Sequence, residues 1–130
     1  MKPDSITAPQ GRRALVIDDD ELVRDTVSSI LESAGYAVVQ AGDGQHGLKL
    51  FHKHPVDLVI TDILMPLKEG IETILELRQR SPEVRIIAMT GGGSIGAVPI
   101  LDAAQQLGAD AVLSKPFSKA DLLGKIEKAD

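Results

Sequence analysis

The sequence contains no cysteine and no tryptophan, and its aromatic residues are one tyrosine and two phenylalanines. Without cysteine the chain can form neither disulfide bonds nor thiolate metal sites, so redox chemistry sets no limit on its compartment. The scarcity of aromatic rings argues against a surface that stacks nucleic-acid bases. The sequence also lacks an apolar run long enough to cross a bilayer, and we expect neither a signal peptide nor a membrane partner.

The charge balance is acidic, with 14 lysine and arginine residues against 19 aspartate and glutamate residues and a net charge of −5. Proteins that bind nucleic acids need a basic surface, so we expect no direct contact with DNA or RNA. Hydrophobic residues make up 43% of the 130 residues. That proportion and length are typical of one globular domain able to bury its own core.

The first residues differ from the rest of the chain. The segment MKPDSITAPQG is polar and contains two prolines, which predicts a flexible N-terminal tail over residues 1–11 and a domain over residues 12–130. Within this domain, short apolar runs rich in β-branched residues are typical of buried strands. They predict strands at residues 14–17, 37–41, 57–61, 84–89 and 111–114.

Amphipathic segments follow each predicted strand and predict five helices. Apolar residues recur at helical spacing from Leu22 to Leu31, within residues 44–52, within 71–78, within 100–107 and within 122–126. Ser118 with Asp121 three residues later predicts the start of the last helix. The alternation predicts an α/β fold, a (βα)5 doubly wound, flavodoxin-like, five-stranded parallel sheet in the order 2-1-3-4-5.

Four consecutive acidic residues, at positions 18–21, come directly after the first predicted strand. One aspartate at such a position can cap the following helix, but helix capping does not account for all four. Four negative charges in sequence repel one another, so we expect a positive group to join them.

The other predicted strands also end in polar residues. In a sheet of this order, ligands bind at the carboxyl ends of the strands, where the chain order reverses. The residues at these ends are Asp18, Asp19, Asp62, Thr90 and Lys115. Each of them alone has an ordinary structural explanation, as a helix cap, a strand former or a solvated lysine. Together they predict that three carboxylates, a hydroxyl and an ammonium meet in one crevice.

The predicted cluster suggests a metal site with room for a phosphoryl group. Asp18, Asp19 and Asp62 cannot all stay ionised close together without a counter-charge. Hard oxygen ligands favour Mg²⁺, Mn²⁺ or Ca²⁺. A divalent ion together with Lys115 would neutralise the cluster, and an aspartate can act as the nucleophile that accepts a phosphoryl group.

At this point the sequence resembles a known family, the receiver domains of bacterial two-component response regulators. The resemblance covers about residues 13–128 and is carried by "LVIDD", by "DILMPLKEG", by the apolar strand that ends in Thr90 and by "KPF". It implies that Asp62 is the phosphoryl acceptor and that Thr90 and Lys115 bind the phosphoryl group. It also implies a bound Mg²⁺, with Mn²⁺ as the alternative. The ion would be bound directly by Asp19, Asp62 and the backbone carbonyl of Leu64, and through a water molecule by Asp18. The resemblance further implies a cis peptide bond between Lys115 and Pro116.

The resemblance further implies a cytoplasmic signalling receiver that catalyses only its own phosphoryl transfer and dephosphorylation. A histidine kinase or a histidine phosphotransfer protein would supply the phosphoryl group, and binding to an unidentified target protein would be the output. We expect a monomer, with dimerisation on phosphorylation as the alternative. Val112 stands where family members often carry an aromatic residue, and the loop "GGGSIGAV" after Thr90 is long and rich in glycine.

Two other functions remain open. "VIDDDELV" also resembles the start of haloacid-dehalogenase-like phosphatases, in which Asp18 would be the nucleophile and Asp20 the general acid. Those enzymes usually add a cap domain or a longer core and carry a late acidic pair, and this short chain has no such pair. A pseudo-receiver that binds its partners constitutively is the third hypothesis. It is disfavoured because the sequence contains each motif residue for phosphorylation.

Overall fold

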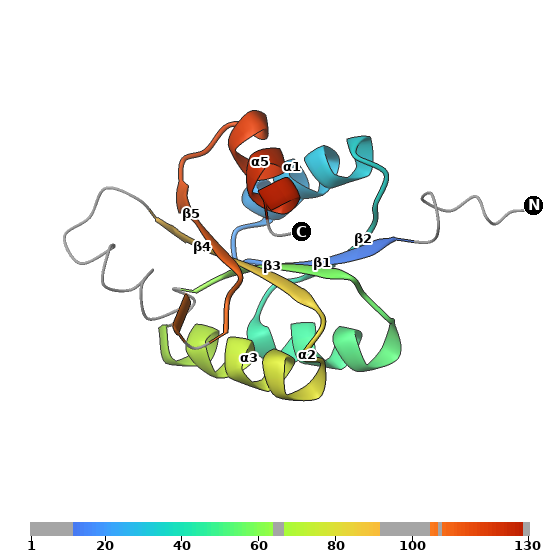
Figure 1. Cartoon of the computed structure of the whole chain (residues 1–130), viewed down its shortest axis with the longest axis vertical. Coiled ribbons are helices and arrows are strands. Elements are labelled where there is room, and N and C mark those ends of the chain that lie inside the picture. The colour runs from blue at the N-terminus through green and yellow to red at the C-terminus, as the bar shows by residue number, and fades with distance from the viewer. Residues whose placement is uncertain (1–11, 64–66, 92–104, 107, 129–130) are drawn as a thin grey trace, which may run out of the picture.

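A computed structural model of the chain describes residues 12–63, 67–91, 105–106 and 108–128. Its five parallel strands form one sheet in the order β2-β1-β3-β4-β5, which confirms the predicted topology (Figure 1). The strands are β1 (Arg13–Ile17), β2 (Ala37–Ala41), β3 (Leu58–Asp62), β4 (Arg85–Gly91) and β5 (Ala111–Lys115). They differ from the predicted strands by no more than a residue or two at an end. The predicted tail over residues 1–11 lies outside the described residues.

Four helices cover the two faces of the sheet within the described part of the chain. They are α1 (Glu21–Ser33), α2 (Gly44–Lys53), α3 (Leu67–Arg80) and α5 (Lys119–Lys128). Helices α1 and α5 lie on one face, and α2 and α3 lie on the other (Figure 1). Most of the predicted helix over residues 100–107 falls outside the described residues. Among the residues described, no helix has the length and apolar character needed to cross a membrane.

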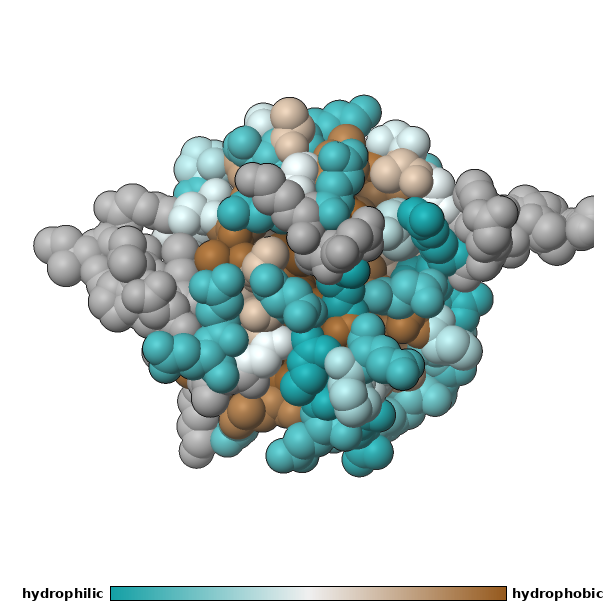
Figure 2. All heavy atoms as spheres, in the orientation of Figure 1, coloured by the Kyte–Doolittle hydropathy of each residue, from teal (hydrophilic) through white to brown (hydrophobic). Residues whose placement is uncertain are grey.

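Two apolar layers hold the helices to the sheet, because neighbouring strand residues point to opposite faces. On β1, Leu15 packs in a cluster with Ile74 and Leu77 of α3, whereas Val16 packs with Leu31 of α1 and Leu122 of α5. Burying one such leucine or isoleucine completely is worth roughly 2 kcal/mol relative to leaving it exposed. In Figure 2, hydrophilic side chains dominate the visible face, and hydrophobic atoms show in small separate areas.

Side-chain caps begin the helices where the sequence predicts them. Asp20 accepts hydrogen bonds from the backbone of Leu22 (2.9 Å) and Val23 (3.4 Å) and starts α1. At the start of α5, the hydroxyl of Ser118 accepts from the backbone N–H of Asp121 (3.0 Å), and the Asp121 carboxylate accepts from that of Ser118 (3.0 Å). This reciprocal pair satisfies two backbone donors that the first helical turn leaves free.

The apolar residues of α1 are not equally buried. The helical spacing places Leu22 on the same apolar stripe as Val27 and Leu31, yet Leu22 is 74% exposed while the other two are fully buried. Leu22 lies in the first turn of α1, whereas the buried residues of this helix, Val27, Ser28 and Leu31, lie further along it. Periodicity predicts the direction of a side chain and not whether a neighbour covers it.

At the amino ends of the strands, Arg78 of α3 joins three segments. Its guanidinium donates to the backbone carbonyls of Pro82 (2.8 Å), Val84 (2.8 Å) and Gly108 (2.7 Å). It also forms a 2.7 Å salt bridge with Asp110. Asp110 in turn accepts from the backbone N–H of Ile86, at 2.8 Å. The network fixes the entry of β4 and β5 into the sheet, on the side opposite the acidic cluster.

Candidate functional site

The carboxyl ends of β1 and β3 bring three aspartates together. The two strands pair directly, with Ile17 beside Thr61, so the residues that follow Ile17 lie next to Asp62. Carboxylate oxygens of Asp18, Asp19 and Asp62 lie within 4.8 Å of one another. Asp18 is fully buried and Asp62 is 6% exposed, whereas Asp19 faces solvent. The cluster therefore has a buried floor and an open side.

Lys115 reaches this cluster from the end of β5. Its ammonium lies 2.7 Å from Oδ2 of Asp18 and 3.5 Å from Oδ2 of Asp62. The Lys115–Pro116 peptide bond is cis, as the resemblance predicts. Among these four side chains, one ammonium stands against three carboxylates, which leaves an excess of two negative charges when all of them are ionised.

Burial and charge act in opposite directions on the Asp18–Lys115 pair. Burial raises the pKa of Asp18 above its ordinary value of 3.8, and the hydrogen bonds from Lys115 and from the backbone N–H of Asp20 offset only part of that effect. Burial lowers the pKa of Lys115, but the hydrogen bond with Asp18 and the charges of Asp62 and Asp18 outweigh it, so this pKa lies above 10.5. Lys115 is consequently a cation at neutral pH.

Thr90 is the remaining residue of the predicted site. It lies near the end of β4, which is the strand between β3, with Asp62, and β5, with Lys115. Thr90 is fully buried, and its hydroxyl has no hydrogen-bond partner among the described residues. A buried hydroxyl without a partner is costly, and an incoming oxygen atom would satisfy it. The predicted hydroxyl, ammonium and carboxylates thus occupy one edge of the sheet.

The donor set fits a hard divalent cation. The cluster offers carboxylate oxygens, an excess of negative charge and one open side, which are the conditions that Mg²⁺ and Mn²⁺ require. Leu64, whose carbonyl the resemblance adds to the ligands, lies outside the described residues.

Gly70 explains the spacing of the "DILMPLKEG" segment. It lies in the first turns of α3, and a Cβ atom there would run into the backbone carbonyl of Ile63, the residue after Asp62. Only glycine lets α3 start this close to the strand end that carries Asp62.

The contacts behind the site include several that the sequence analysis missed. Glu69, in the same turn of α3, accepts a hydrogen bond from the backbone N–H of Gly44 (2.7 Å) and so links α3 to the start of α2. On the other side of the site, Arg24 of α1 donates to the backbone carbonyl of Asp18 (2.7 Å). The spacing of apolar residues in the sequence does not reveal either contact, because each depends on whether a long side chain on one element can reach the backbone of another.

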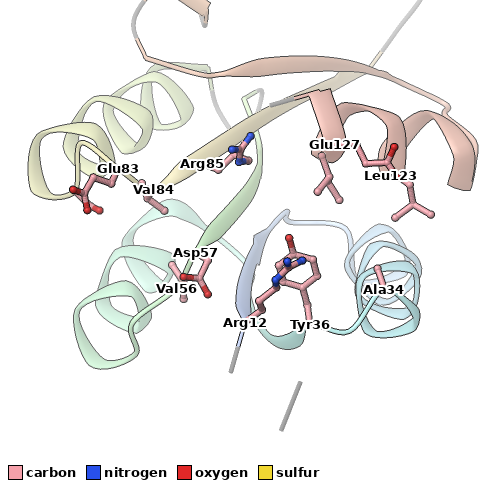
Figure 3. Close-up of a pocket in the computed structure, with 12 residues that line it drawn as sticks. Arg12, Ala34, Tyr36, Val56, Asp57, Glu83, Val84, Arg85, Leu123 and Glu127 are labelled. Atoms are coloured by element: carbon pink, nitrogen blue, oxygen red, sulfur yellow. The ribbon is translucent and has the colours of Figure 1, made fainter. Parts of the chain in front are cut away.

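A separate pocket of about 550 Å³ lies at the amino ends of the strands (Figure 3). The Arg12 guanidinium lies 5.9 Å from the ring centre of Tyr36, and Arg85 projects from the start of β4. The acidic residues of its lining are Asp57, Glu83 and Glu127. Charges of both signs are interleaved in this pocket, whereas the carboxylate cluster of the described residues lies at the opposite edge of the sheet.

Comparison with known proteins identifies the family. The model of the response regulator receiver domain family matches residues 14–127, nearly all of the chain. The chain belongs to this family. The flavodoxin-like sheet and the acidic edge are thus those of a signalling receiver domain of two-component systems.

Three similar proteins illustrate the match. The transcriptional regulatory protein PdtaR of Mycobacterium tuberculosis is 36% identical over 119 residues, which are 91% of this chain and 56% of PdtaR. The response regulator receiver protein CpdR of Brucella abortus is 34% identical over 90% of this chain and 95% of CpdR. The crystal structure of a response regulator from Burkholderia pseudomallei, with a phosphorylated aspartic acid, calcium ion and citrate, superimposes with a TM-score of 0.77. It is 32% identical and covers 88% of this chain and 65% of that one. The chain spans about half the length of PdtaR and nearly all of CpdR.

Proposed function

We propose that this receiver domain works in a phosphorelay, in which Asp62 accepts a phosphoryl group from a histidine kinase or a histidine phosphotransfer protein. The phosphorylated domain then changes its binding to a target protein. Asp18, Asp19, Asp62 and the carbonyl of Leu64 would hold Mg²⁺, for which Mn²⁺ could substitute. When bound, the ion neutralises part of the negative charge around the transferring group.

The protein's own groups perform the transfer as follows. A carboxylate oxygen of Asp62 attacks phosphorus, the P–O bond to Asp62 forms and the P–N bond to the donor histidine breaks. Lys115, already 3.5 Å from Oδ2 of Asp62, binds one phosphoryl oxygen, and the Thr90 hydroxyl donates to another. Later hydrolysis of the acyl phosphate restores the carboxylate and releases inorganic phosphate.

The position of Lys115 is the observation that carries this proposal. Its ammonium lies 2.7 Å from Asp18 and 3.5 Å from Asp62. At the same edge of the sheet, Thr90 lies near the end of β4, and its hydroxyl has no partner among the described residues. The related response regulator of Burkholderia pseudomallei contains a phosphorylated aspartic acid with a calcium ion, which supports the same chemistry here.

Chemical phosphorylation tests the choice of nucleophile. The protein is incubated with Mg²⁺ and a small acyl phosphate, and the acid-labile modification is mapped by mass spectrometry. We expect the phosphoryl group on Asp62 and no modification in Asp62→Asn. Asp18→Asn tests the alternative nucleophile: it should still carry the phosphoryl group on Asp62, but at a lower rate, because a carboxylate that helps to hold Mg²⁺ and Lys115 has been removed.

Two results would reverse the assignment. A phosphoryl group on Asp18 would favour the phosphatase-like alternative, in which that residue is the nucleophile. Modification of Asp62→Asn at an unchanged rate would remove Asp62 from the reaction altogether.

A groove beside the site is a suitable place for the phosphoryl donor to dock. It has a volume of about 440 Å³ and lies between α1 and the segment after β5. Its lining is mainly apolar: Leu22, Val23, Thr26, Val27, Lys115, Pro116 and Phe117. We propose that an apolar side chain of the donor protein covers the exposed Leu22 while the donor histidine faces Asp62.

Two leucine variants test this docking. Leu22→Ser should slow transfer from phosphorylated histidine phosphotransfer domains and leave labelling by the small acyl phosphate unchanged. Leu75→Ser, at another exposed leucine on α3, is the control and should change neither rate. Equal effects of the two variants would show that the groove is not the docking site.

We further propose that the domain acts in the cytoplasm as a signalling receiver, whose only catalysis is its own phosphorylation and dephosphorylation. We expect a monomer when unphosphorylated. Sedimentation of the protein with and without acyl phosphate would detect the alternative, dimerisation on phosphorylation.

A further inference from the structure

Arg24 holds the peptide that joins the two neighbouring aspartates of the site. The residue lies in the second turn of α1, half-buried, and its Nη1 donates to the backbone carbonyl of Asp18 at 2.7 Å. That carbonyl belongs to the peptide group between Asp18 and Asp19. A hydrogen bond from a charged guanidinium is stronger than one between neutral groups, so it restricts the rotation of this peptide.

The sheet itself does not hold this carbonyl. The N–H of Asp18 still bonds to the carbonyl of Ala41, the last residue of β2 (3.1 Å). Beyond Ala41 the chain turns away, and Asp43 caps α2. The carbonyl of Asp18 therefore lies past the end of the β2 ladder, and Arg24 provides the donor that the strand no longer supplies.

A second set of contacts keeps Arg24 in place. Its Nε donates to the side-chain carbonyl of Gln40 on β2, at 3.2 Å. The amide nitrogen of Gln40 donates to the hydroxyl of Ser28 (2.9 Å) and to the carboxylate of Asp25 (3.3 Å), both on α1. Two separate N–H groups of one planar guanidinium thus bond Asp18 and Gln40 at once, which the single nitrogen of a lysine does less well.

Asp19 depends on this arrangement more than Asp18 does. The Asp18 carboxylate has its own partners in Lys115 and the backbone N–H of Asp20. The Asp19 carboxylate is exposed and has no hydrogen bond or ion pair within the described ranges, so its backbone determines where it lies. Fixing the peptide before Asp19 fixes its Cα and the direction of its side chain.

We propose that Arg24 is a positioning residue of the metal site, supported by Gln40, and that it acts by fixing the Asp18–Asp19 peptide. The part of this inference that concerns Mg²⁺ rests on the proposed function. The part that concerns the peptide does not, because it can be measured in the metal-free protein.

The metal-free test uses amide hydrogen exchange in Arg24→Met, which keeps an unbranched apolar side chain in place of the arginine stem and removes its donors. The N–H of Asp20 bonds to Oδ1 of Asp18 (2.8 Å) and so reports the order of this turn. We expect it to exchange roughly tenfold faster than in the wild type, since a hydrogen bond to a charged group has been lost. Unchanged exchange in Arg24→Met would overturn the proposal.

The metal test compares Mg²⁺ affinity by calorimetry in matched arginine variants. Arg24→Met should bind Mg²⁺ about tenfold more weakly, as expected when a residue that supports a metal ligand is removed. Arg24→Lys should recover part of the affinity. Arg78→Met is the control, because Arg78 also donates to backbone carbonyls but at the far end of the sheet. It should lower the melting temperature and leave Mg²⁺ affinity unchanged.

A double mutant tests the role of Gln40. If Gln40 acts through Arg24, Gln40→Met should weaken Mg²⁺ binding less than Arg24→Met, and the double variant should bind no more weakly than Arg24→Met alone. Equal loss of affinity in Arg24→Met and Arg78→Met would mean that instability alone is responsible, which would reject the positioning role. Absence of Mg²⁺ binding in the wild type would reject the proposed function, while the exchange of the Asp20 amide would still decide the role of Arg24.

Discussion

Thr61 and Thr90 are both fully buried, on the adjacent strands β3 and β4, but their hydroxyl groups have different surroundings. The hydroxyl of Thr61 donates to the carbonyl of Asp62, at 3.2 Å. That of Thr90 has no partner among the residues described. Within one sheet, the pair thus contrasts a hydroxyl that is hydrogen-bonded in the fold with one that is not, among the described residues.

Replacing each threonine by valine keeps the branched shape and removes the hydroxyl. Thr90→Val should raise the free energy of unfolding of the metal-free protein by about 1 kcal/mol, because a buried polar atom without a partner is removed. The same change should slow the phosphorylation of Asp62 by acyl phosphate. Denaturant unfolding and the labelling rate measure the two effects.

Thr61→Val is the matched control. It loses a hydrogen bond, so it should lower the free energy of unfolding by about 1 kcal/mol and leave the labelling rate nearly unchanged. A Thr90→Val protein that is less stable than the wild type would show that the Thr90 hydroxyl already has a partner in the unphosphorylated state.

Among the helices, α5 has the start that the sequence defines best. Hydrogen bonds from the backbone N–H and the hydroxyl of Ser118 hold the pKa of Asp121 below its ordinary value of 3.8. A lowered carboxyl pKa stabilises the fold at pH values above the unfolded pKa. This contribution is lost as the pH falls through the lower, folded pKa.

We therefore expect the stability difference between wild type and Asp121→Asn to be full at neutral pH and to vanish below pH 3.8. Ser118→Ala should cost about 1 kcal/mol, because it removes the acceptor for a backbone N–H of the first turn. Unfolding in denaturant across this pH range measures both. An Asp121→Asn deficit that persists unchanged in acid would show that the carboxylate does not act through its charge.

The strands and helix starts could be predicted because each has a local physical cause. Apolar β-branched runs identify β1 to β5, and the Ser118–Asp121 spacing identifies the cap of α5. The exposure of Leu22 could not be predicted, since a helical stripe does not reveal where the neighbouring elements end. The close approach of Gly70 to Ile63 was also invisible in the pattern, because it arises only after α3 and β3 have packed.

At the scale of the whole molecule, the location of the site follows from topology. Parallel strands in the order 2-1-3-4-5 bring their carboxyl ends to one edge, so the polar residues at those ends had to meet. The sequence could not predict the network of Arg24, Gln40 and Ser28, which depends on side-chain reach between α1 and β2. The rest of the glycine-rich loop, from residue 92 on, lies outside the described residues.

The charge of the folded molecule leads to a prediction about Mg²⁺. The chain carries a net charge of −5, and in the described cluster the carboxylates of Asp18, Asp19 and Asp62 gather around the ammonium of Lys115. A cation that binds only the folded state must stabilise it, by about 2.7 kcal/mol when free ion is about 100 times its dissociation constant. For a domain of 130 residues that corresponds to a rise in melting temperature on the order of 10 °C.

The control must separate a bound ion from general screening, because any salt weakens repulsion in an acidic protein. NaCl at the same ionic strength should raise the melting temperature of the wild type and of Asp19→Asn by similar, small amounts. Mg²⁺ should add its larger increment to the wild type alone, since Asp19→Asn loses a ligand. Without metal, Asp19→Asn should be at least as stable as the wild type, because one like charge leaves the cluster. A wild-type melting temperature that responds to Mg²⁺ no more than to NaCl would mean that the aspartates repel one another without ever holding a metal ion.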